Sequence, residues 1–333
     1  MHEKYVRDLL FADDAAITTH TQEDLQRLLD RFSDACRHFG LTISLAKTQV
    51  MGQDIKEIPS LFIHNYKLEV VHEFVYLGST ITDNLSIDSE LNKRIGKAAT
   101  TLSRLTKRVW SNNKLSDHTK VNVYKACVIS TLLYGSESWT MHAHQEKRLN
   151  VFHMRCLRRI LGITWQDRVT NKVVLEKAGI PSLYTLLKQR RMRWLGHVTR
   201  MKDGRIPKDL LYGELASGKR PTGRPQLRFK DVCKRDLQAL GINTDSWEVT
   251  ATDRDAWRHT VKVGLSQYEE TQRLKAEEKR LHKKTACLAN GPTTPFTCSK
   301  CNRDCHSQIG LHSHNRRCRM GANLWSFEID RCQ

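Results

Sequence analysis

The chain has 333 residues, and its 55 Lys and Arg against 36 Asp and Glu give a formal net charge of +19 at pH 7. A chain of this length has room for roughly two domains, and its hydrophobic content of 39% excludes a wholly disordered protein. The strong positive charge favours a polyanion, most simply nucleic acid, as the partner.

Membrane and secreted classes are disfavoured by the apolar pattern and by the cysteines. The longest apolar run, Ala126 to Tyr134, is about half of the ~20 residues that a membrane-spanning helix requires, and the charged N-terminus lacks a secretory signal. Five of the ten cysteines lie in the last 36 residues, among histidines, whereas the other five are isolated. This clustering predicts a metal site in a reducing compartment, nuclear or cytoplasmic, rather than a disulfide framework.

The N-terminal stretch carries strand and helix patterns in turn. Apolar runs on either side of Asp13 and Asp14 predict a β-hairpin over residues 5–17, with the two carboxylates at its tip. An amphipathic helix follows, with Thr21 as the expected N-cap and Gly40 as the left-handed residue after its end. Its apolar stripe consists of Leu25, Leu28, Leu29, Phe32, Cys36 and Phe39.

Three further segments, 41–44, 67–71 and 74–78, have the pattern of short strands. A helix between strands predicts an α+β sheet domain over residues 1–83.

Helical periodicity dominates from about Ser89 onward. It predicts a basic helix marked by Ile95 and Val109, then helices over about 117–134 and 144–161. We therefore expect a helical region over 84–165 and a basic helical region over 166–289, with a charged helix near 267–285. Within the latter, residues 188–235 hold 15 Lys and Arg against 4 Asp and Glu, and Gly218–Pro225 reads as a loop.

The C-terminal cysteines carry the most specific pattern in the chain. Cys298-x2-Cys301-x12-His314-x3-Cys318 has the spacing of a one-zinc ββα finger, in which four ligands converge on Zn²⁺. We expect this finger over residues 290–320, followed by a tail over 321–333, with zinc supplying most of its folding energy. Three neighbours remain rival ligands, namely Cys305, His306 and His312.

The finger's expected reading surface lacks residues suited to base recognition. If its helix starts in the usual register, the base-facing positions are Ser307, Gly310 and Ser313, none of which makes a bidentate base contact. Arg316 and Arg317 would instead contact phosphates. We expect a binder with little sequence specificity, and a role in docking a protein partner stays open.

Asp13 and Asp14 form a weak motif alone, because most such pairs are solvated turns. In context, Phe11-Ala12-Asp13-Asp14 resembles motif C of reverse transcriptases of the non-LTR (LINE-type) retrotransposons, residues 40–51 resemble motif D, and residues 74–79 resemble motif E, the primer grip. The helical stretch up to about 160 resembles the thumb, and residues 191–197 and 218–225 resemble the region that follows the polymerase. The terminal Cys/His motif also fits that family.

The resemblance implies the C-terminal part of an endonuclease–reverse transcriptase polyprotein. Its fold would be a partial palm sheet, a mostly α-helical thumb and basic region, and a small zinc finger. Asp13 would bind catalytic Mg²⁺, Asp14 would be its weaker neighbour, and Lys47 would lie near the leaving pyrophosphate. Only ten residues precede Phe11, so motifs A and B, including the other metal-binding Asp, are missing. We therefore expect no polymerase activity from this chain alone, and Mg²⁺ only in a completed site.

Nucleic-acid contacts are expected from the basic stretch and from the end of the finger. The candidates are Arg190, Arg191, Arg193, Lys219, Arg220, Arg224, Arg228, Arg316 and Arg317. Three hypotheses follow: a truncated reverse transcriptase that binds zinc and RNA or DNA without catalysis, an RNA-directed DNA polymerase that is active once upstream sequence completes it, and a zinc-finger module that binds a protein.

Overall fold

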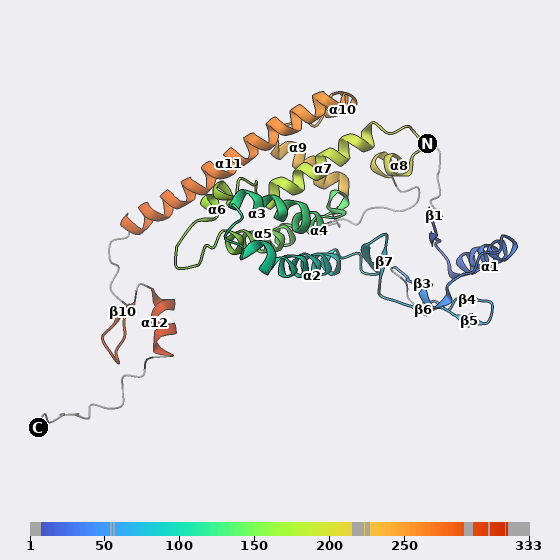
Figure 1. Cartoon of the computed structure of the whole chain (residues 1–333), viewed down its shortest axis with the longest axis horizontal. Coiled ribbons are helices and arrows are strands. Elements are labelled where there is room, and N and C mark those ends of the chain that lie inside the picture. The colour runs from blue at the N-terminus through green and yellow to red at the C-terminus, as the bar shows by residue number, and fades with distance from the viewer. Residues whose placement is uncertain are drawn as a thin grey trace, which may run out of the picture. The chain divides into compact units, whose positions relative to one another are not determined.

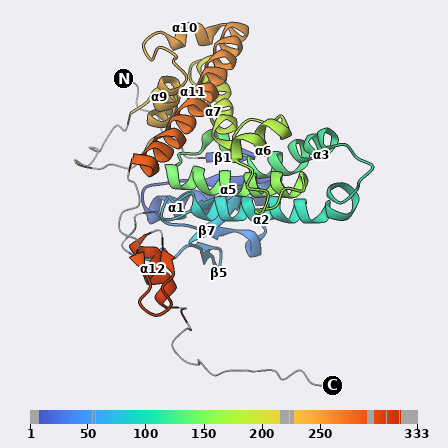
Figure 2. The ribbon, with the colours of Figure 1, turned by 90° about the vertical axis from the view of Figure 1, so that its left-hand side faces the viewer.

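The computed structural model describes residues 8–53, 55, 57–214, 223, 227–289, 296–305, 307–316 and 318. They fall into two compact units, Met1–Thr271 and Gln272–Gln333, whose helices and strands are labelled in Figure 1 and drawn from a second side in Figure 2. Helices predominate, and the strands form small sheets. None of the helices in the described part is both long and apolar enough to cross a membrane.

The predicted hairpin and the helix after it are confirmed. Strands β1 (Asp8–Phe11) and β2 (Asp14–Ile17) pair antiparallel, with Phe11 opposite Asp14. Helix α1 (Gln22–His38) begins where the Thr21 hydroxyl accepts a hydrogen bond from the Asp24 amide at 3.1 Å, and Gly40 after its end has φ of +68°. The prediction for Phe39 is wrong: it lies beyond the last helical residue, and 82% of its surface is exposed.

The strands that follow are short and pair only in twos within the described residues. Strand β3 (Gln49–Val50) runs parallel to β6 (Glu69–Val70), β4 (Phe62–Ile63) pairs with β5 (Tyr66–Lys67), and β7 (Glu73–Tyr76) pairs with β8 (Ser79–Thr82). The predicted strand at 41–44 is absent. These residues have irregular backbone and are followed by a 3₁₀ turn, η1 (Leu45–Lys47).

The described part of residues 1–83 therefore does not form one continuous sheet. Strands of two to four residues are shorter than the usual five or six, and they provide too little apolar surface for one broad layer. The local core consists of only Leu29, Val50, Leu61, Ile63 and Leu68, with partly buried neighbours. The expectation of mixed helix and strand is confirmed. The strands form separate two-stranded sheets, and the palm assignment stays a prediction.

A larger core lies among the helices that follow. They are α2 (Asp88–Arg104), η2 (Thr106–Trp110), α3 (Asp117–Val123), η3 (Tyr124–Ile129), α4 (Ser130–Leu132), η4 (Ser136–Ser138), α5 (Ala143–Ile160), α6 (Asn171–Ala178) and α7 (Leu183–Thr199). Leu91, Tyr124, Leu132, Leu149 and Leu187 are fully buried in this core. The predicted helices at 117–134 and 144–161 agree with these elements, although two π-helical turns, η2 and η3, interrupt the α-helical geometry.

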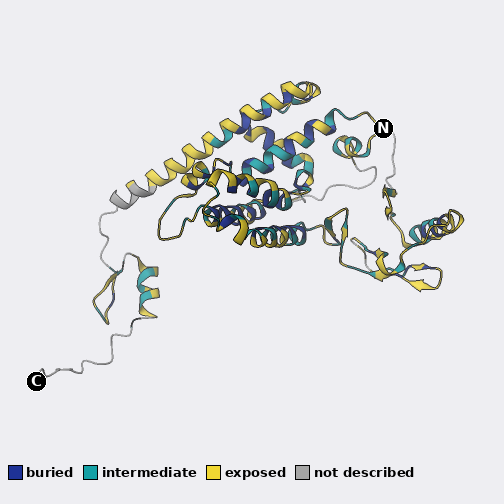
Figure 3. Ribbon diagram, in the orientation of Figure 1, coloured by how far each residue is buried: buried dark blue, intermediate teal, exposed yellow. Residues whose placement is uncertain are grey.

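A second helical core shares α7 with the first. The remaining helices are α8 (Ile206–Tyr212), α9 (Phe229–Ala239), α10 (Trp247–Thr252) and α11 (Arg254–Ala289), which contains the predicted helix at 267–285. Met192 and Leu195 of α7 pack with Leu237 of α9 and with Trp257 and Val261 of α11. Figure 3 shows these buried faces in dark blue, whereas residues 270–282 of α11 are exposed. The predicted loop at 218–225 lies outside the described residues except Gly223.

The second unit ends in two short strands and a helix. Strands β9 (Phe296–Thr297) and β10 (Asp304–Cys305) pair antiparallel, and α12 (Gln308–Asn315) follows. Ser307 caps α12, because its hydroxyl accepts a hydrogen bond from the Gly310 amide at 3.1 Å. This order of elements holds the cysteines and histidines of the C-terminal motif.

Candidate functional site

The carboxylates of the predicted catalytic pair are exposed at the tip of the first hairpin. Ala12, with φ of +52°, and Asp13 form the turn, and Asp14 begins β2. In the described part of the chain, no third carboxylate, histidine or cysteine lies close enough to complete a metal site with them. Two metal ions about 3.5–4 Å apart need ligands from more than one strand, so the hairpin supplies at most one side of such a site.

Lys47 is exposed on η1. The described structure gives it no hydrogen bond or ion pair with either Asp13 or Asp14. Its assignment to a leaving pyrophosphate therefore stays a prediction.

The β7–β8 hairpin, which corresponds to the motif E resemblance, is held from two sides. Leu77 and Gly78 form its turn with φ of +48° and +80°, as a two-residue hairpin turn requires. The Tyr76 hydroxyl donates to the Leu9 carbonyl at 2.9 Å, which ties this hairpin to β1.

Arg94 of α2 anchors the same turn from the helical side. Its guanidinium donates to the Gly78 carbonyl at 2.5 Å and to the Glu90 carboxylate at 2.6 Å, and it lies 4.5 Å from the centre of the Tyr134 ring. Arg94 is only 5% exposed. Its guanidinium is therefore occupied by partners within the protein, although the sequence places Arg94 on a helix rich in Lys and Arg.

Four side chains of the C-terminal motif converge in the second unit. The ligand atoms of Cys298, Cys301, His314 and Cys318 all lie within 4.8 Å of one another. Cys298 Sγ and Cys318 Sγ are 3.9 Å apart, close to the ~3.8 Å expected of two thiolates on one tetrahedral Zn²⁺. Cys301 Sγ lies 3.1 Å from His314 Nε2. This Cys₃His donor set fits a metal ion such as zinc.

Local backbone geometry prepares Cys298 for ligation. Asn302, with φ of +54°, lets the chain turn back so that its amide donates to the Cys298 carbonyl at 2.8 Å. The Lys300 amide donates to Cys298 Sγ at 3.4 Å. This hydrogen bond contributes most, together with hydrogen bonds involving Cys301 and Cys318, to lowering the pKa of the Cys298 thiol to about 6. A thiolate is the form that binds a metal.

The rival ligands lie outside this cluster or outside the described residues. Cys305 Sγ faces the Arg303 carbonyl at 3.9 Å, and His312 is exposed. His306 is not among the described residues. α12 begins at Gln308, the helix start on which the prediction of Ser307, Gly310 and Ser313 as base-facing positions depends.

The structure separates the predicted nucleic-acid contacts into different environments. Arg193 and Arg316 are exposed, and Arg228 pairs with Asp231 while about half of its side chain stays exposed. Arg190 is half-buried and donates to the Leu133 carbonyl at 2.9 Å. Four more, Lys219, Arg220, Arg224 and Arg317, lie outside the described residues.

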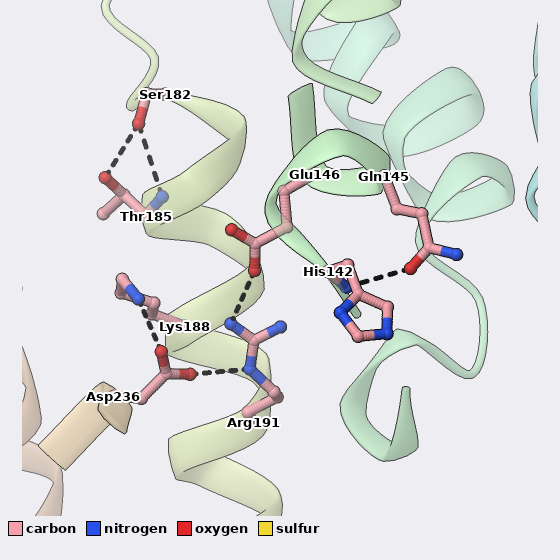
Figure 4. Close-up of polar contacts among 8 residues, drawn as sticks. All are labelled: His142, Gln145, Glu146, Ser182, Thr185, Lys188, Arg191 and Asp236. Atoms are coloured by element: carbon pink, nitrogen blue, oxygen red, sulfur yellow. Dashed lines mark hydrogen bonds and ion pairs between the residues drawn. The ribbon is translucent and has the colours of Figure 1, made fainter. Parts of the chain in front are cut away.

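Arg191 is the residue whose expected role the geometry contradicts. It is 1% exposed, and its guanidinium donates to the Asp236 carboxylate at 2.6 Å and to the Glu146 carboxylate at 3.2 Å (Figure 4). Lys188 donates to the other Asp236 oxygen at 2.5 Å. A buried arginine within this network has no access to a phosphate, so we leave it out of the interface. No local pattern indicates the pairing, because Asp236 lies 45 residues away.

Comparison with known families places the Asp13–Asp14 hairpin in context. Residues 3–81 match the family model described as reverse transcriptase (RNA-dependent DNA polymerase). Residues 3–81 are reverse transcriptase-like. The match includes the β7–β8 hairpin up to Ile81, so the segments that resemble motifs C, D and E fall inside it.

The relatives come from mobile elements. A transposon-derived protein of Caenorhabditis elegans is 26% identical over 77% of this chain and 95% of its own length. The RNA-directed DNA polymerase from mobile element jockey of Drosophila funebris is 25% identical over 47% of this chain, which spans only 18% of that polymerase. The probable RNA-directed DNA polymerase from transposon X-element of Drosophila melanogaster is 24% identical over 48% of this chain. No solved structure matches.

Proposed function

We propose that this chain is part of a non-LTR retrotransposon reverse transcriptase that binds zinc and holds RNA or DNA with little sequence preference, and that it does not extend a primer by itself. The observation that carries this proposal is the reverse transcriptase match over residues 3–81, on a chain whose charge of +19 suits a polyanionic partner. Residues 1–83 would be the palm remnant and the helices after them the thumb.

The convergence of Cys298, Cys301, His314 and Cys318 supports zinc binding. Three thiolates and one imidazole are a common structural zinc set, and closed sites of this type stabilise small domains rather than catalyse. The exposed Arg316 at the end of α12 would contact phosphates. The small residues expected at the base-facing positions would add little sequence specificity.

The exposed hairpin supports inactivity of this chain alone. Asp13 and Asp14 have no third metal ligand near them in the part of the chain that the structure describes. Phosphoryl transfer with two Mg²⁺ ions needs a further carboxylate to hold both the attacking and the leaving oxygen. A second polypeptide that supplies motif A would complete the site.

A fluorescence titration tests nucleic-acid binding. The full chain is titrated against single-stranded RNA and duplex DNA at several salt concentrations, with zinc and with chelator. We expect the logarithm of the binding constant to fall linearly with the logarithm of the salt concentration. We also expect the affinity to weaken when zinc is removed by the chelator. Zinc retention without any binding at moderate salt would instead favour a finger that docks a protein, consistent with the 83% exposure of Ile309 on α12.

Primer extension tests the catalytic part of the proposal. The chain alone should give no product with Mg²⁺, and a mixture with a polypeptide that carries motif A distinguishes an incomplete site from an inert one. If the mixture is active, Asp13→Asn should abolish the activity and Asp34→Asn, on the exposed face of α1, should not. Extension by the chain alone would refute inactivity.

A further inference from the structure

A cavity of about 520 Å³ opens on the surface of the first unit, along α5. Its wall includes Asn150, Met154, Arg155, Arg158, Arg159 and Asn171. We call it the α5 pocket. None of its arginines belongs to the basic stretch at 188–235 or to the finger.

The three arginines bring positive charge to the pocket without a compensating carboxylate. No acidic residue lines the pocket, and within the described residues none of the three forms an ion pair. Arg158 donates to the Val169 carbonyl at 3.0 Å, and Arg159 donates to the Thr106 hydroxyl at 3.1 Å. Both partners are neutral, so each guanidinium keeps its charge and its remaining N–H groups.

The rest of the wall is mixed, with the apolar side chains of Val151, Met154 and Ile163 beside the polar Asn150 and Asn171. The side chain of Asn150 makes no hydrogen bond within the described residues, and its Oδ1 is buried without a partner. Asn171 begins α6, whose N-cap residue, Thr170, makes no side-chain capping bond. The positive end of the α6 dipole adds to the charge of the arginines.

Size and composition decide which ligand fits. A volume of about 520 Å³ is in the range of small-ligand sites and exceeds what a single inorganic phosphate fills. The lining has no aromatic residue, so it offers no platform for stacking a base. An arginine fork matches phosphate oxygens in pairs.

We propose that the α5 pocket binds the phosphodiester backbone of a nucleic acid, with Arg155, Arg158 and Arg159 as its phosphate contacts. The proposal rests on the proposed nucleic-acid function and locates a part of the interface that the basic stretch does not include. Contacts of this kind position a strand without reading its sequence.

The test compares two double variants of the full chain on one probe, a fluorescent 12-nucleotide single-stranded RNA. Arg155→Gln/Arg159→Gln removes two pocket charges and keeps the bond from Arg158 to Val169. Arg31→Gln/Arg37→Gln removes two exposed charges from α1 and serves as the matched control. Circular dichroism and the melting temperature verify that both variants fold.

We expect the pocket variant to bind at least about tenfold more weakly than the control and to lower the salt slope by roughly 1.4, since each lost contact on a single strand removes about 0.7. The pocket variant and the control variant should bind an RNA with an uncharged methylphosphonate backbone equally weakly. If the pocket variant and the control bind the charged RNA alike while the wild type binds well, the pocket proposal fails and the proposed function stands. If the wild type does not bind at all, both fail.

Inorganic phosphate and AMP distinguish a small ligand from a backbone. We expect millimolar concentrations of either to compete only weakly with the RNA. Strong binding of AMP that the pocket variant loses, with unchanged RNA affinity, would overturn the proposal in favour of a small phosphate ligand.

Discussion

The Tyr124 hydroxyl and Nδ1 of His153 share a hydrogen bond of 2.8 Å, and both side chains have no exposed surface. Their rings stack with centroids 5.7 Å apart. Burial lowers the pKa of His153 to about 4 and raises that of Tyr124. The imidazole is therefore neutral in the native state near pH 7.

This pair predicts a pH dependence of stability. The unfolded chain takes up the His153 proton near pH 6.5 and the native chain only near pH 4, so stability falls as pH drops through that window and is fully present above it. We expect His153 to contribute a loss of about 2 kcal/mol between pH 7 and pH 5 in urea unfolding. His153→Gln should remove that part of the loss, whereas exposed His118→Gln should leave it unchanged. An unaltered pH profile in His153→Gln would contradict the assignment.

The network around Arg191 makes a second prediction. Arg191→Met leaves Glu146 without its partner and Asp236 with Lys188 alone, so the free energy of unfolding should fall by about 3 kcal/mol. Arg193→Met, two residues along and exposed, should change it by less than about 0.5 kcal/mol. Binding should respond in the opposite way, with a lower salt slope only for the Arg193 variant. Equal stability of the two variants would show that the network contributes little.

Gly196 gives a prediction about packing. A Cβ atom at Gly196 would lie 2.2 Å from Nε1 of Trp257, whose indole donates to the Met192 carbonyl at 2.9 Å. Gly196→Ala should therefore destabilise the chain by about 1–3 kcal/mol. Gly96 of α2 has open space around it, and Gly96→Ala should stabilise by up to about 1 kcal/mol through helix propensity. Thermal unfolding of both variants measures the contrast.

Zinc stoichiometry tests the Cys₃His cluster. Cys298→Ser removes the buried ligand, so one equivalent of zinc should be lost and the signals of residues 296–318 should collapse to those of an unfolded segment. Cys305→Ser should keep the metal, because Cys305 lies outside the cluster. Absorption of the Co²⁺-substituted protein reports thiolate ligation directly. Full zinc content in Cys298→Ser would refute the ligand assignment.

Local patterns were enough to predict elements whose causes lie within a few residues. The first hairpin follows from apolar runs around Asp13 and Asp14, and α1 from its Thr21 cap and apolar spacing. The convergence of Cys298 and His314 likewise follows from their spacing. Each depends on short-range stereochemistry, which a single sequence displays.

Features that depend on distant partners could not be predicted. Nothing near Arg191 indicates that Asp236 will pair with it, and a basic stretch predicts exposure by default. Residues 41–44 alternate like a strand, but no strand among the described residues pairs with them, and their backbone is irregular. Arg155, Arg158 and Arg159 do carry a usable signal, since a spacing of three and four places them on one helical face. Only the tertiary structure reveals a cavity beside them.

The sharing of α7 has a consequence for cooperativity. Leu183 and Leu187 belong to one core, and Met192 and Leu195 belong to the other. If either core unfolds, α7 loses apolar contacts, and the other core depends on the same helix. Calorimetry should accordingly resolve a single transition for the two cores together. Lesions far apart along the chain, in α2 and in α9, would then lower the same melting temperature.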